Sequence, residues 1–144
     1  MFDPDIEVQK AIYAAVTTPV ITLGDQVVPV YSHVPSTASA PYILLSQVST
    51  AATSGAMACK YAECVFQLTI LTSFPDPGIA YDLPIYTISG QVVNALDGKK
   101  LPLADGYSMR PLVVDYKRNA SRYNNNSLEV LRYIRVKTIV FKNK

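Results

Sequence analysis

The sequence predicts an α+β domain, with a mixed or antiparallel sheet and two helices packed on one of its faces. Two segments carry apolar residues at helical spacing, and several others alternate apolar and polar residues as half-buried strands do. The predicted order is α-β-β-β-β-α-β-β. The chain has 144 residues, of which 49% are hydrophobic, so it is long enough to bury a substantial core. We therefore treat residues 1–144 as a single domain.

The first helix is expected to begin at Asp3-Pro4-Asp5 and to run to about Thr17. Its start combines a capping carboxylate, a proline in the first turn and acidic residues at the positive end of the helix dipole. Pro19 is expected to end it. One apolar stripe should face the core, and it consists of Ile6, Ile12, Tyr13, Ala15 and Val16.

Three strand segments are expected next. Residues 20–23 and 27–34 form a pair joined by a Gly-Asp turn, although Pro29 makes the second an edge or irregular strand. After a loop of small residues, a strong strand is expected over residues 42–48. Residues 49–58 are small and polar, and we expect a mobile linker there.

The clearest strand is expected over residues 60–74, because its even positions are apolar and its odd positions are mostly polar. After a break at Asp76-Pro77-Gly78, a second helix is expected over residues 83–96, ending at Asp97-Gly98. The side of the strand that should pack on the core consists of Ala62, Cys64, Phe66, Leu68 and Ile70.

Two strands, over residues 112–116 and 128–142, are expected to complete the domain. Residues 117–127 between them are rich in Arg and Asn, and we expect a loop there. In the last strand apolar and basic residues fall on opposite faces, with Arg135 on the outer one. The loop at residues 99–107 has room for one further short strand at residues 100–103.

Charge is distributed unevenly along the chain. Residues 110–144 contain nine Lys/Arg and two Asp/Glu, a balance of +7, whereas residues 1–109 contain four Lys/Arg and nine Asp/Glu, a balance of −5. A protein with one basic and one acidic surface can attract copies of itself head to tail, or bridge two partners. The charge pattern therefore favours a role in assembly.

No motif of catalysis is present in the sequence. His33 is the only histidine, and no G-x-S-x-G elbow or phosphate-binding loop occurs. Cys59 and Cys64 stand five residues apart on the predicted strand and point to opposite faces, which makes a disulfide between them improbable. Two cysteines and one distant histidine do not supply the four ligands of a zinc site. We therefore expect no enzyme, no metal site and no cofactor.

Nucleic acid is one alternative partner for the basic segment. Arg118, Arg122, Tyr123, Arg132 and Arg135 interleave cations with aromatic rings, as single-strand binders do. However, the sequence pI is only about 8.5. We therefore favour a solvated hairpin face or a protein interface over nucleic-acid binding. The weaker form of the nucleic-acid hypothesis is a basic rim along a channel through which nucleic acid passes without being recognised. The acidic start of the chain and the lack of a long apolar run lead us to expect no signal peptide and no membrane partner.

The order and spacing of these segments resemble those of the tail-completion, or tail-terminator, proteins of long-tailed bacteriophages. The resemblance extends from about Asp5 to Phe141. It includes a small-residue loop leading into Ala40-Pro41-Tyr42, a long alternating strand, a helix at residues 88–96 and a basic strand at residues 131–136. The whole chain would then be one tail-terminator-like domain.

The resemblance implies a non-enzymatic ring, usually a hexamer, that caps the tail tube, ends its growth and offers a surface to the head-closure or connector protein. Genome DNA would pass through the ring without specific binding. The protein would lie at the tail–neck junction of the virion after assembly in the host cytoplasm. Another neck or head-closure protein and, less favoured, a single-strand nucleic-acid binder remain as alternatives.

The charged segments supply candidate contact residues for such a ring. Arg118, Arg122 and Tyr123 are expected to contact a neighbouring copy or a tail-tube subunit, and Arg132 and Arg135 lie on the same basic segment. The nearest acidic counterpart is the start of the first helix, with Asp3, Asp5 and Glu7.

Overall fold

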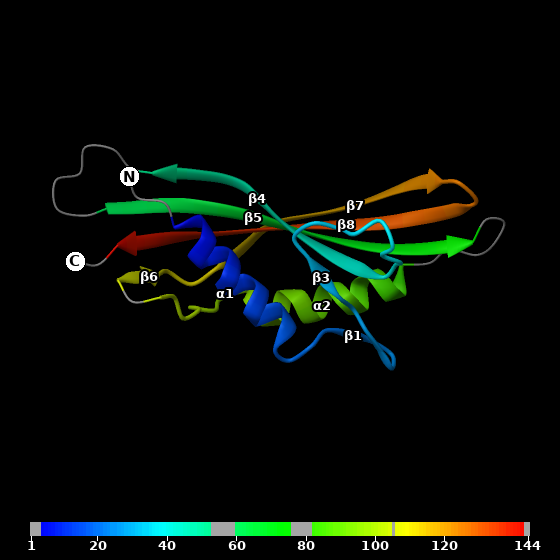
Figure 1. Ribbon diagram of the computed structural model, residues 1–144, viewed down its shortest axis with the longest axis horizontal. Coiled ribbons are helices and arrows are strands. Elements are labelled where there is room, and N and C mark those ends of the chain that lie inside the picture. The colour runs from blue at the N-terminus through cyan, green and yellow to red at the C-terminus, as the bar shows by residue number, and fades with distance from the viewer. Residues whose placement is uncertain (1–3, 53–59, 76–81, 105, 143–144) are drawn as a thin grey trace.

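A computed structural model describes residues 4–52, 60–75, 82–104 and 106–142. It shows one long, twisted sheet with two helices beneath it (Figure 1). The α+β class and the predicted order are confirmed, with the second predicted strand divided in two and one short strand added before the last pair. The elements are α1 (Asp5–Thr17), β1 (Thr22–Leu23), β2 (Gln26–Val27), β3 (Val30–Tyr31), β4 (Tyr42–Ala52), β5 (Lys60–Pro75), α2 (Leu83–Leu96), β6 (Tyr107–Met109), β7 (Val113–Asn124) and β8 (Ser127–Lys142).

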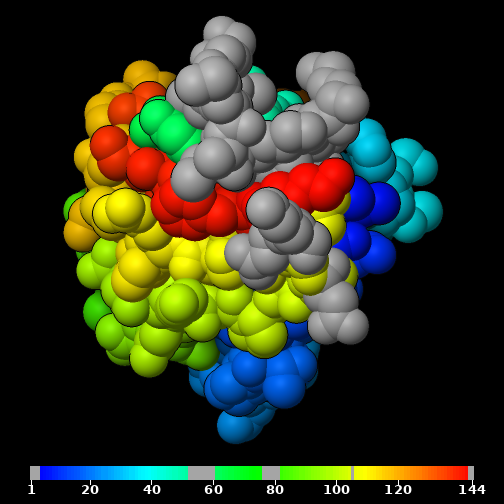
Figure 2. All heavy atoms as spheres, turned by 90° about the vertical axis from the view of Figure 1, so that its left-hand side faces the viewer, coloured from blue at the N-terminus to red at the C-terminus, as the bar shows by residue number. Residues whose placement is uncertain are grey.

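The sheet is built around β5 and β8, which pair along their whole length. On the far side of β5 lies β4, and β4 in turn pairs with the short β3. On the far side of β8, β7 and β6 pair with different stretches of the same strand. Figure 2 shows the end of the molecule where β8 (red) finishes beside the segment that carries β6 (yellow). The β3–β4 pair is parallel, and every other pair is antiparallel.

The core lies between the helices and one face of the sheet. The even positions of β5 from Ala62 to Thr72 are buried, and they oppose even positions of β8, so that Leu68 faces Ile134 and Phe66 faces Val136. From below, α2 contributes Ile85, Ile88, Val92 and Leu96 to the same core. Two side-chain hydrogen bonds join α2 to β1, because the amide group of Gln91 accepts from Thr22 N and donates to Thr22 O.

The apolar stripe predicted for α1 is partly wrong. The buried residues are Val8, Ile12 and Val16, spaced four apart. Ile6 and Tyr13 are 63% and 46% exposed, although the prediction placed them in the core. The helix is therefore rotated relative to the expected stripe, because packing on the sheet and on α2 decides which face of a helix is buried when apolar residues surround it.

The edge elements also differ from the prediction. The segment predicted over residues 27–34 forms two short strands separated by Pro29, whose carbonyl accepts from Ile43 N. No strand forms over residues 100–103; instead Leu101 N donates to the sulfur of Met109, and Met109 belongs to β6.

The two segments predicted as loops are largely strand. Residues 49–52 continue β4 after a bulge between Gln47 and Ser49, and residues 53–59 of the predicted linker lie outside the described residues. The loop predicted over residues 117–127 is wrong. Residues 117–124 pair with β8, and only Asn125 and Asn126 form the turn. Asn125 has a φ of 56°, a left-handed conformation that Asn tolerates better than most residues.

Candidate assembly surface

β7 is the most exposed of the long strands, and it forms a hairpin with β8 over residues 113–142. The turn of this hairpin lies at the right in Figure 1, and β8 runs back from it to the left-hand end of the sheet. Ten of the twelve residues of β7 are exposed, and Tyr123 near the turn is 72% exposed. The face of β7 and β8 that lies opposite the helices is covered by no described helix, whereas on the other face Asn119 of β7 donates a hydrogen bond to the Tyr86 hydroxyl of α2.

Three of the predicted contact residues share the helix-free face of this hairpin. Arg118 lies opposite Tyr133 in the register, and its guanidinium is 4.9 Å from the ring centroid. Arg135 lies at the same distance over Tyr116. Such stacked pairs fix the arginine while leaving its edge free to donate hydrogen bonds.

The third residue on this face, Arg122, forms an ion pair with Glu129, with 2.7 Å between Nε and Oε1. Glu129 is the one charged residue that is buried among those described, at 8% exposure. The side-chain hydrogen bond to Glu129 raises the pKa of Arg122, and burial lowers it by a smaller amount. Arg122 therefore remains a cation and fixes the orientation of this carboxylate.

The other two basic-segment candidates lie on the helix side. Arg132 donates to Ser89 of α2 at 2.9 Å and stacks over Tyr86 at 4.9 Å. Tyr123 lies opposite Leu128, whose side of β8 faces α2. The structure thus brings Arg118, Arg122 and Arg135 to one face and separates them from Arg132 and Tyr123. The sequence did not indicate the faces of Arg118, Arg122 and Tyr123, because residues 117–127 were expected to form a loop.

Two of the acidic candidates, Asp5 and Glu7, lie on α1. Asp5 accepts a hydrogen bond from the Thr50 hydroxyl of β4, and Glu7 lies 3.9 Å from the ammonium of Lys10. Asp3 lies outside the described residues. The start of α1 and the turn of the β7–β8 hairpin stand at opposite ends of the long axis of the molecule (Figure 1). Asp5 and Glu7 at the start of α1 are therefore far from the hairpin turn within one molecule.

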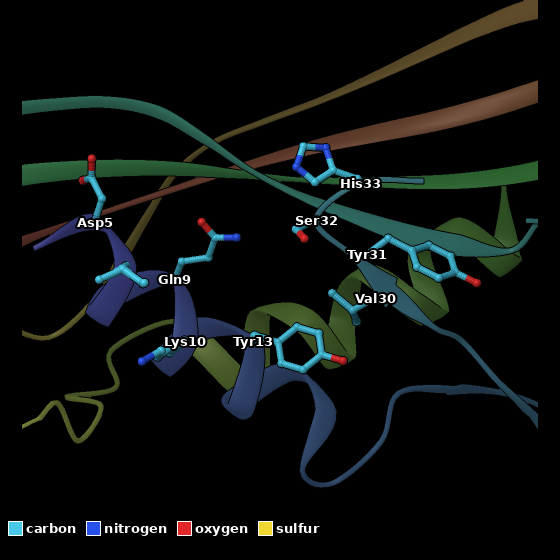
Figure 3. A pocket seen from close by; sticks show the side chains of 9 residues that line it. Asp5, Gln9, Lys10, Tyr13, Val30, Tyr31, Ser32 and His33 are labelled. Carbon is cyan, nitrogen blue, oxygen red and sulfur yellow. The ribbon is translucent and has the colours of Figure 1, made fainter. Parts of the chain in front are cut away.

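A groove between α1 and β3 was not expected from the sequence. It has a volume of about 780 Å³, and Figure 3 shows side chains from α1 on one side and from β3 and the residues after it on the other. Ile6 and Tyr13, the two residues misplaced in the predicted core, lie here. The signal for the groove was an excess of apolar residues on α1 over what one buried stripe needs. The lining consists of Asp5, Ile6, Gln9, Lys10, Tyr13, Val30, Tyr31, Ser32 and His33.

The described residues show neither a metal cluster nor a membrane-spanning helix. No group of three or more His, Cys, Asp or Glu side chains among them is placed to hold a metal ion. Neither α1 nor α2 is long and apolar enough to cross a bilayer. His33 lines the groove between α1 and β3, where Ser32 is its neighbour in sequence.

A long sheet with helices on one face and a projecting basic hairpin defines a protein suited to assembly with others. Residues 10–136 match the family model described as tail completion protein gp17. The chain belongs to this family, and it has a structural role in the phage tail.

Among solved structures, the chain is similar to one in the virion of a native gene transfer agent particle. The TM-score is 0.72 at 16% identity, over 96% of this chain and 98% of that one. At this identity the likeness shows the fold. No curated protein matches the chain.

Proposed function

We propose that this protein forms a ring, most simply a hexamer, that caps the tail tube, ends its growth and joins the tube to the head connector. The observation that carries the proposal is the separation of charge along one molecule of a tail-completion family member. Because the basic hairpin and the acidic start of α1 lie at opposite ends, they can pair only between molecules. A repeated contact of this head-to-tail kind closes into a ring when the rotation between copies divides a full turn.

Each candidate residue has a role in this arrangement. Arg118, Arg122 and Tyr123 contact the neighbouring copy or a tail-tube subunit from the exposed part of the hairpin. Arg132 and Arg135, which stack on tyrosines of their own chain, hold the hairpin in shape for that contact. The acidic counterpart on the neighbour is the start of α1, with Asp3, Asp5 and Glu7.

The partners follow from the position in the particle. One face of the ring binds the tail-tube protein, and the other binds the head-closure or connector protein. Genome DNA passes through the ring without being read. The protein acts at the tail–neck junction after assembly in the host cytoplasm.

Light scattering and co-sedimentation with headless tail tubes test the proposal. We expect the wild type to form a ring and to bind tubes in the absence of heads, which a head-closure protein would not do. Arg118→Glu should weaken ring formation, because it reverses a charge on the hairpin. Lys100→Glu, an exposed charge reversal outside the hairpin, is the matched control and should have little effect. A monomer at high protein concentration that does not bind tubes would count decisively against the proposal.

A further inference from the structure

The two outer long strands of the sheet each leave part of an edge unpaired. On β4, β3 covers only Ile43 and Leu44, and no described strand pairs with that edge over residues 45–51. On β7, Asp97 accepts from Val114 N, and no described strand pairs with the outer edge over residues 116–124. Unpaired N–H and C=O groups along such edges are templates for another strand.

Each edge is only partly protected. A bulge interrupts each strand, between Gln47 and Ser49 on β4 and between Val114 and Tyr116 on β7, and β7 also carries the exposed Lys117. Natural edge strands are commonly blocked by charged side chains or proline. The β4 sequence, Tyr42–Ala52, contains neither, and its one irregularity is the bulge between Gln47 and Ser49. On β7 the arginines are drawn back over their own sheet, since Arg118 stacks on Tyr133 and Arg122 pairs with Glu129. The backbone edge between them is thus left accessible.

The strand directions suit a head-to-tail junction between copies. The four long strands run in the order β4-β5-β8-β7, and each neighbouring pair is antiparallel. Because this number is even, a continued sheet brings β7 of one copy antiparallel to β4 of the next. The register across the sheet places Tyr116 level with Ser46, through Arg135 and Gln67. In this register the free parts meet only at Leu45–Ser46 of β4 and Tyr116–Lys117 of β7. Fuller pairing needs a stagger of about four residues at each junction, as closed sheets have.

The groove between α1 and β3 lies beside the free edge of β4. Its lining includes Asp5, which bonds Thr50, and Tyr31, which pairs with Leu44, so the groove follows β4 between these two points. Figure 3 shows β4 passing over the space between α1 and β3. A strand laid against this edge would cover Ile6 and Tyr13, whose exposure the isolated molecule leaves unexplained.

We infer that β7 of one copy adds to the free edge of β4 in the next copy and covers the groove between α1 and β3, so that the sheets of neighbouring copies are continuous. This inference rests on the proposed ring. It adds to the proposed ring the pair of strand edges that joins neighbouring copies, and both edges belong to copies of the same chain. The groove supplies apolar contact to the added strand.

Disulfide crosslinking between the two edges tests this inference. In a background with Cys59→Ser, each of Ser46→Cys and Ser49→Cys on β4 is combined with each of Tyr116→Cys and Ala120→Cys on β7. These side chains share the helix-free face, and the two positions on each strand allow for stagger. Mild oxidation should give at least one double variant a ladder of covalent oligomers that ends at the ring size. The four single variants should stay uncrosslinked, because each carries a thiol on only one side of the junction.

The outcomes separate the inference from the function on which it rests. Covalent dimers from a single variant would mean that like edges meet, which overturns the head-to-tail pairing. A ring seen by light scattering, with no crosslink in any double variant, overturns the edge pairing and leaves the ring intact. A protein that forms no ring and binds no tube overturns both.

The groove has its own test in two matched exposed residues at helix starts. Ile6 is 63% exposed and lies in the groove, and Leu83 of α2 is 69% exposed and lies outside it. We expect Ile6→Ser to raise the concentration at which the ring dissociates about tenfold, the effect of losing one buried aliphatic contact. Leu83→Ser should leave it unchanged. Equal effects of the two substitutions would contradict a role for the groove.

Discussion

Arg122 is the charge partner of Glu129, and Glu129 is the one buried charged residue among those described. Arginines elsewhere on the hairpin are held by tyrosine rings of the same chain. The sequence indicated these arginines as a basic surface, but it did not show that each has an internal partner. Pairing across strands is a long-range property, because it depends on which residues the register brings opposite each other.

We expect Arg122→Ala to lower the free energy of unfolding by about 1–2 kcal/mol, because Glu129 then lacks its charge-assisted hydrogen bond. The value is below that of a fully buried pair, since the Arg122 side chain is 57% exposed and water screens the interaction. Urea denaturation measures the change. Lys117→Ala, a charge removal at an exposed position of the same strand, should cost less than about 0.5 kcal/mol. Similar losses for both would show that Glu129 does not need this partner.

The raised pKa of Arg122 adds no pH dependence near neutrality. A group whose pKa is higher in the folded state stabilises fully below its unfolded pKa, and loses that effect only as the pH rises through the folded value. For an arginine this range is strongly alkaline. The difference in urea midpoint between wild type and Arg122→Ala should thus be the same at pH 6 and pH 8. If the difference in urea midpoint disappeared at pH 8, this expectation would be contradicted.

At the scale of elements, local pattern predicted the parts of the fold that have one buried face. β5 and β8 alternate, and α2 presents apolar residues one or two turns apart, so their faces could be assigned from the sequence. The faces of β7 could not be assigned in this way, because β7 is exposed along most of its length and carries no alternation of apolar and polar residues. It is a strand because β8 pairs with it. The face of α1 was misjudged for a related reason, since apolar residues on two sides of a helix leave its rotation undetermined.

The turn of the β7–β8 hairpin makes a prediction at this scale. Asn125 has a φ of 56°, where a β-branched side chain is strained. We expect Asn125→Val to lower the free energy of unfolding by about 1–2 kcal/mol. Asn126→Val is the control, because Asn126 is the other turn residue and its φ is not positive. The urea midpoints of the two variants measure the two losses of stability. Equal losses would show that the left-handed conformation of Asn125 is not the cause of the destabilisation.

At the scale of the whole molecule, the composition bias along the chain becomes a separation in space. The sequence showed a basic last third and an acidic remainder. The structure places the hairpin turn and the start of α1 at opposite ends of a long sheet (Figure 1). The candidate residues were thus indicated by charge, whereas their division between two faces, and the groove beside β4, required the packing of α1 and the pairing of β7.

Salt should therefore weaken the ring. Charges that attract between copies at the surface are screened beyond about 8 Å at physiological ionic strength. We expect the concentration at which the ring dissociates to rise at least tenfold between about 50 mM and 500 mM NaCl, measured by light scattering. Urea denaturation of the monomer should change much less over the same range. A ring unaffected by salt would mean that the charged ends are not in contact.

The most direct test of the proposed function is to add the purified protein to growing, headless tail tubes and to image the tubes by electron microscopy. Capping predicts a ring at one end of each tube and an arrest of elongation once the ends are occupied. Tubes that continue to lengthen, or protein bound along their sides with none at the ends, would contradict it.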